Sequence, residues 1–84
     1  MIAITVPDSI KSQDRETLWE ACCSSYPHLV MNDDCDIELR EWRVSRGDNT
    51  TADQYRDERV TLRDCIYNLG FCIENCESDS WHIT

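Results

Sequence analysis

The chain has 84 residues, of which 40% are hydrophobic and 30% charged, and its seventeen acidic and eight basic side chains give a formal net charge of −9. A charge of this sign and size disfavours direct binding to nucleic acid or to an anionic membrane and favours contact with basic protein surfaces. The length suits one compact domain with a small core, which we expect to span residues 1–84. No apolar run reaches the roughly 18 residues that cross a membrane, and the N-terminus, MIAITVPD, lacks the features of an export signal. We therefore predict a cytoplasmic location.

The N-terminal third of the chain predicts a strand followed by a helix. Ile2, Ile4 and Val6 alternate with smaller or polar residues, which is typical of a strand with one buried face, and Pro7 ends the run. An apolar stripe at spacings of three and four residues then predicts a helix that stops at the Tyr26–Pro27 step. The members of this stripe are Leu18, Ala21, Cys22 and Ser25.

The middle of the chain is harder to interpret. Residues 28–36 are expected to form a loop that ends in an acidic run. For residues 37–44 we favour a strand over a helix because Ile, Trp and Val favour strands. Ile37 and Leu39 would then face one side of the sheet and Trp42 and Val44 the other, which predicts a bulge or a strand buried on both faces.

The C-terminal half predicts a helix followed by a hairpin. Thr51 and Gln54 have the spacing of a capping box, and Gly70 is suited to end the helix. The apolar stripe of this helix consists of Tyr55, Leu62, Cys65, Ile66 and Leu69. Alternation in residues 71–73 and 81–83 then predicts two short strands joined by a turn. The whole order indicates an α+β fold, a small sheet of three to four short strands with two helices packed on one face, and leaves the strand order open.

The six cysteines allow two alternatives to a reduced protein. Cys72, Cys76 and His82, completed by His28 and the Cys22–Cys23 pair, could form a zinc site. However, adjacent residues of a helix point about 100° apart and do not converge on one ion. A secreted domain with three disulfides would give meaning to the adhesion tripeptide at residues 46–48. The missing export signal favours six thiols, so we expect neither a metal nor a cofactor. No catalytic motif is present, and we expect no enzymatic activity.

Two groups of charged residues are candidates for binding a partner. The first is an acidic loop whose spacing and sign are similar to those of a row of phosphates, made of Asp33, Asp34, Asp36 and Glu38. The second is a set of arginines on one face of the second helix, Arg56, Arg59 and Arg63. Arginine is enriched in protein interfaces, so this face is a candidate contact surface. A simpler explanation exists for each group. The acids can be a solvated surface, and the arginines can pair with Asp53, Asp57 and Asp64 of their own helix.

In size and charge the chain resembles the small acidic proteins with which bacterial viruses disable host enzymes, among them DNA mimics, anti-restriction proteins and anti-CRISPR proteins. This resemblance implies a phage-encoded, non-enzymatic inhibitor that acts in the host cytoplasm. Its partner would be a protein with a basic surface, such as a nucleic-acid-binding complex, whose nucleic-acid site it occludes. The alternatives are a zinc- or thiol-dependent small binding module and a secreted disulfide-stapled domain.

Overall fold

The computed structural model describes residues 1–23, 26–31 and 36–84. Within this part of the chain the elements are, in order, β1 (Ile2–Thr5), α1 (Ser12–Cys23), β2 (Leu29–Met31), β3 (Glu41–Arg46), α2 (Ala52–Asn68), β4 (Ile73–Glu74) and β5 (Ser80–Ile83). The predicted α+β class is confirmed. The sheet, however, has five strands among the described residues, where the sequence predicted three to four.

The unexpected strand is β2, which lies in the segment predicted to be a loop. Leu29 pairs with Arg46 and Met31 with Val44, so β2 is the antiparallel neighbour of β3. A strand of three residues with one fully buried side chain, Leu29, gives almost no alternation in the sequence. Its conformation is determined by pairing with β3 rather than by local preference.

The predicted strand over residues 37–44 is confirmed only from Glu41 onward. Residues 37–40 form turns and bends, so Ile37 and Leu39 do not belong to the ladder. Trp42 and Val44 are both buried on the same face of β3. The apparent switch of apolar residues from one face to the other, which suggested a bulge, therefore marks the boundary between a turn and a strand.

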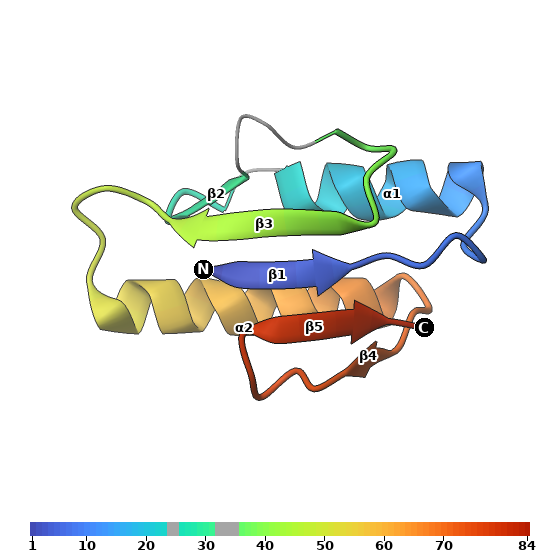
Figure 1. The fold of residues 1–84 in the computed structure, drawn as a ribbon. Coiled ribbons are helices and arrows are strands. Elements are labelled where there is room, and N and C mark those ends of the chain that lie inside the picture. Colours follow the sequence, from blue (N-terminus) through green and yellow to red (C-terminus); the bar gives the residue numbers. More distant parts are fainter. Residues whose placement is uncertain (24–25, 32–35) are drawn as a thin grey trace.

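The strand order of the sheet is β2-β3-β1-β5-β4 (Figure 1). β1 lies at the centre, antiparallel to β3 and parallel to β5, and β4 closes the far edge antiparallel to β5. Because β1 and β2 are both antiparallel to β3, they are parallel to each other with β3 between them. This is the split βαβ arrangement, in which α1 crosses over a strand that belongs to a later part of the chain.

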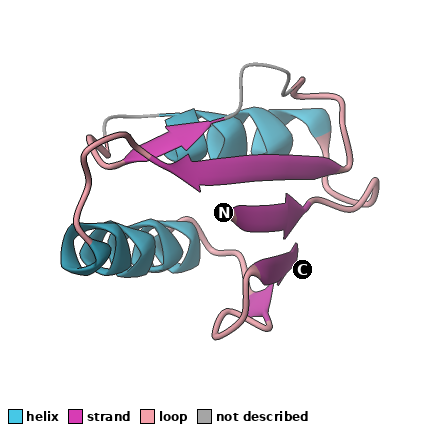
Figure 2. Ribbon diagram, turned by 60° about the vertical axis from the view of Figure 1, so that its left-hand side comes forward, coloured by secondary structure: helices cyan, strands magenta, loops and turns pink. Residues whose placement is uncertain are grey.

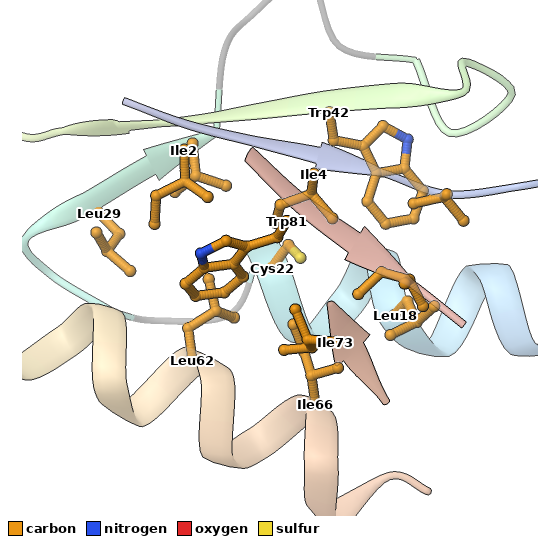
Figure 3. Close-up of a cluster of buried hydrophobic side chains, with 13 residues drawn as sticks. Ile2, Ile4, Leu18, Cys22, Leu29, Trp42, Leu62, Ile66, Ile73 and Trp81 are labelled. Atoms are coloured by element: carbon orange, nitrogen blue, oxygen red, sulfur yellow. The ribbon is translucent and has the colours of Figure 1, made fainter. Parts of the chain in front are cut away.

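Both helices cover one face of the sheet, α1 over the β2–β3 side and α2 beside β1 and the β4–β5 hairpin (Figures 1 and 2). Trp42, Ile4 and Trp81 are neighbours across three strands and all point into this layer. Figure 3 shows the Trp81 ring reaching from β5 toward Leu62 of α2. The other face carries the alternate residues of the strands, including Arg43 and His82, and is exposed.

The ends of α2 form as the sequence predicts. The Thr51 hydroxyl accepts a bond from the Gln54 backbone N–H at 3.1 Å, and the Gln54 side chain accepts one from the Thr51 N–H at 3.0 Å, which completes the capping box. At the other end Gly70 has a φ of 97°, and the Phe71 N–H donates back to the Ile66 carbonyl at 3.3 Å. A positive φ at this position favours glycine, because glycine has no Cβ to clash with the backbone in this conformation. In the described part of the chain, neither helix combines the length and apolar character needed to cross a bilayer.

Candidate interaction surfaces

Exposed carboxylates surround α1 and define what we call the acidic surface. Its described members are Asp8, Asp14, Glu16, Glu20, Asp36 and Glu38, all of them exposed. Asp8 and Glu38 come from segments on either side of α1 in the sequence, and they line one shallow hollow together with Arg15. Of the four predicted acidic site residues, Asp36 and Glu38 therefore belong to this surface. Asp33 and Asp34 lie outside the described residues.

The turn that carries Asp36 and Glu38 is held partly by Asp36 itself. The Asp36 carboxylate accepts a bond from the Glu38 backbone N–H at 2.9 Å, and the Asp36 carbonyl accepts one from the Leu39 N–H at 2.9 Å. Short acidic side chains stabilise turns in this way because they reach the backbone two residues further on. Glu38 is exposed at the surface of this turn.

The buried Arg15 side chain connects this turn to α1. Its guanidinium donates to the carbonyls of Ile37 and Leu39 and, at 3.3 Å, to that of Val6 at the end of the first strand segment. The guanidinium carbon lies 5.4 Å from the centroid of the Trp42 ring, and the residue is only 7% exposed. A buried cation is tolerated when its donors are used and an aromatic face lies against it. Arg15 thus joins α1, β1, β3 and the acidic turn.

The position of Arg15 changes the charge that the surface presents. Residues 1–38 contain eight acidic side chains against Lys11 and Arg15, a net charge of −6. The guanidinium of Arg15 donates to three backbone carbonyls, and among the described carboxylates of this region it forms no ion pair. Lys11 is then the one exposed Lys or Arg in this part of the sequence. We did not predict this role for Arg15, although it lies three residues before Leu18 on the apolar stripe of α1, and that spacing is the signal that marks it.

The three predicted arginines come together in a groove between α2 and the β4–β5 hairpin, which we call the arginine groove. It has a volume of about 340 Å³ and is lined by Arg56, Arg59, Val60, Arg63, Cys76, Glu77 and Trp81. The acidic surface lies around α1, near the β2–β3 edge of the sheet, whereas the groove lies at the β4–β5 edge (Figure 1). The structure therefore separates the two groups of predicted site residues into two surfaces.

The arginines of the groove differ in how firmly they are held. The Arg59 side chain is 19% exposed, pairs with Asp79 of the hairpin at 2.6 Å, donates to the Ser78 carbonyl and lies 5.7 Å from the Trp81 ring centroid. Within the described part of the chain, Arg56 and Arg63 form ion pairs with acids of their own helix, Asp53 at 3.7 Å and Asp64 at 3.1 Å. The expected pairing at helical spacing is thus confirmed for Arg56 with Asp53; Arg63 contacts its sequence neighbour Asp64, and Arg59 joins the helix to the hairpin.

The residues that suggested a zinc site or an adhesion motif take part in other local contacts. Cys65, Cys72 and Cys76 are thiols, and within residues 1–23, 26–31 and 36–84 no three His, Cys, Asp or Glu side chains form a group that could hold a metal ion. His28 of the zinc hypothesis lies with its Nδ1 2.9 Å from a carboxylate oxygen of Glu58 on α2. In the adhesion tripeptide, the Arg46 guanidinium donates to the Thr50 carbonyl of its own turn, with the Nε atom at 2.8 Å. These contacts fix the turns before β2 and before α2.

Tyr26 lies where the two helices meet and gives a prediction at alkaline pH. Burial, followed by a hydrogen bond with Cys65, raises the pKa of the Tyr26 phenol from 10.0 to about 12. A folded-state pKa above the unfolded value favours the neutral form, so this contribution to stability is complete below pH 10 and is lost as the pH rises toward 12. We expect the ultraviolet titration of tyrosinate to show a late step that Tyr26→Phe removes. A titration that Tyr26→Phe leaves unchanged would contradict this assignment.

No protein-family model matches the chain, and no curated protein or solved structure is significantly similar to it. The two charged surfaces therefore have to be interpreted from their own chemistry.

Proposed function

We propose that this protein is a non-enzymatic inhibitor or regulator that binds a partner protein through its acidic surface. The partner is a protein with a basic, nucleic-acid-binding surface, which the exposed carboxylates occlude in place of phosphates. The proposal places the protein in the class of phage-encoded anti-defence proteins, of the anti-CRISPR or anti-restriction type, acting in the host cytoplasm.

The observation that carries this proposal is the combination of exposed acids with the buried Arg15. Six carboxylates around α1 are exposed, Asp8 among them in a surface pair with Arg40, and the buried Arg15 donates to three backbone carbonyls. Carboxylates gathered around one helix produce a local negative field, which raises the rate of association with a positive patch. Charges that served only solubility would not need to be grouped in this way.

The test compares two triple variants that remove the same charge from different places. Glu16→Gln, Asp36→Asn and Glu38→Gln together change the acidic surface, and each new side chain keeps the size of the old one and an oxygen that can accept a hydrogen bond. Both the parent and the variant are immobilised and used to capture proteins from a bacterial lysate at low salt. We expect the parent to retain a partner that duplex DNA displaces and that rising salt releases, and the variant to retain at least about tenfold less of it.

The control is the triple variant Asp48→Asn, Asp57→Asn and Glu74→Gln, which also changes the net charge from −9 to −6. These three acids are exposed and lie away from α1. We expect this control to retain the partner nearly as well as the parent does. Equal loss in both variants would mean that only the total charge matters, and equal retention would mean that binding uses another surface; either result rejects the proposal.

A further inference from the structure

We propose that the arginine groove is a second binding surface, and that it takes an acidic segment of a partner protein that carries an apolar side chain among its carboxylates. This surface differs from the acidic surface in place and in charge, so the proposal goes beyond the function proposed above. Three features of the groove lead to this ligand chemistry: an apolar floor, two arginines that are easily redirected, and one arginine that is fixed.

The floor of the groove is apolar. Its accessible apolar surface comes from Val60 of α2, which is 40% exposed, and from Cys76 of the hairpin; Trp81, only 1% exposed, borders the groove from the side of the core. An exposed β-branched residue beside a tryptophan and a thiol provides a surface from which a ligand side chain can displace water. A purely polar anion such as phosphate would leave this part of the groove unused.

The groove is lined by three arginines and one acid, Glu77, so its net charge is positive, and two of its arginines can rearrange. Arg56 and Arg63 are seven residues apart on α2, a rise of about 10 Å, and so lie two turns apart on the same side of the helix. Their present partners, Asp53 and Asp64, are exposed, and exposed ion pairs contribute only about 0–1 kcal/mol. An incoming carboxylate can therefore replace either partner at little cost and form a bidentate pair with a guanidinium.

Arg59 keeps the groove open between these two residues. Its bonds to Asp79 and Ser78 hold the hairpin against α2, and its guanidinium covers the Trp81 ring. The base of the groove is consequently present before any ligand binds, which lowers the entropic cost of binding. Arg59 is a positioning residue in this site, and Arg56 and Arg63 are the ligand-binding ones.

A flexible acidic segment fits this site better than nucleic acid does. The protein carries a net charge of −9, which repels a long polyanion over its whole length. A short segment places only a few carboxylates near the rim, and at 0.1 M salt the repulsion from more distant charges is screened beyond roughly 10 Å. The alternation of acidic and apolar side chains in such a segment matches the charged rim and apolar floor.

The experiment uses a blocked peptide, acetyl-Glu-Glu-Leu-Glu-Glu-amide, titrated into the full-length protein in 0.1 M salt and followed by NMR. The indole N–H of Trp81, which donates to the Ser78 carbonyl at 3.0 Å, reports on the floor of the groove. We expect this signal to shift and saturate, and the Trp19 and Trp42 indole signals to stay in place. Replacing the peptide's Leu by Ser, or its Glu residues by Gln, should each weaken binding at least about fivefold.

Arg63→Gln should weaken binding of the peptide about fivefold, whereas Arg43→Gln, which removes the same charge from the open face of the sheet, should change it less than about twofold. Circular dichroism checks that both variants remain folded. The proposal is overturned if the Trp81 signal does not respond, if both variants behave alike, or if inorganic phosphate produces the same shifts as tightly as the peptide does. It is also overturned if the Trp81 signal shifts with protein concentration alone, because a second copy of the chain would then be the occupant.

Discussion

Leu62→Ala is expected to destabilise the protein by about 2–5 kcal/mol. Leu62 is 0% exposed on the inner face of α2 and lies beneath Trp81 in the layer between helix and sheet (Figure 3). Truncation removes the transfer free energy of its methyl groups and leaves a cavity that the rings around it can fill only in part. A domain of this length has a total stability of about 4–13 kcal/mol, so this one change removes a large share of it.

The matched control for this change is Leu69→Ala in the last turn of the same segment. Leu69 is 39% exposed, so the same chemical change there should cost no more than about 0.5–1 kcal/mol. For a domain of this size each kcal/mol moves the melting temperature by about 4–8 °C. Thermal unfolding followed by circular dichroism should therefore separate the two variants clearly, and melting curves that shift equally would show that Leu62 is not part of the core.

Arg15→Met is expected to cost about 2 kcal/mol and to loosen the acidic turn. Methionine keeps the length and helix preference of the side chain but leaves the carbonyls of Val6, Ile37 and Leu39 without their donor. Two of these carbonyls lie near the surface and can turn toward water, so the cost stays below that of three fully buried groups. Chemical unfolding measures the loss, and faster hydrogen exchange at residues 37–39 should accompany it.

Arg40→Met provides the control because it removes the same charge from an exposed site. Arg40 pairs with Asp8 at the protein surface, with both side chains mostly exposed, and such a pair contributes about 0–1 kcal/mol. We expect its free energy of unfolding to stay within about 0.5 kcal/mol of the parent and its exchange at residues 37–39 to be unchanged. An equal loss in the two variants would show that Arg15 acts only through its charge and not through its three backbone contacts.

Placing Arg15 inside the protein also links stability to the proposed function. Arg15 donates to the backbone carbonyls of the acidic turn, so the same side chain supports the fold and the turn that presents Asp36 and Glu38. Arg15→Met should consequently weaken capture of a basic partner even though it makes the net charge more negative. Arg40→Met, which also makes the charge more negative, should not.

Local signals in the sequence determined several parts of this structure. The capping box of Thr51 and Gln54 and the glycine at position 70 act over a few residues, and the structure contains both as predicted. Of the predicted apolar stripe of α2, Leu62 and Ile66 are buried, whereas Leu69 is exposed. The strand at residues 2–5, the first helix and the C-terminal hairpin were predicted for the same reason. The excess of acids in residues 1–38 is likewise a property of composition, and it needed no fold to be recognised.

Only the tertiary structure decided the rest, because those features depend on partners far apart in the chain. β2 is a strand through its pairing with β3, and β3 begins at Glu41 because β1 pairs with it there. Arg15 is buried because the carbonyls at positions 37 and 39, more than twenty residues away, accept its bonds. The pairing of Arg59 with Asp79 across 20 residues created a groove that helix spacing alone did not predict. Local preference fixed the helices and their ends, whereas contacts between distant segments fixed the register of the sheet and the two surfaces on which the protein can bind a partner.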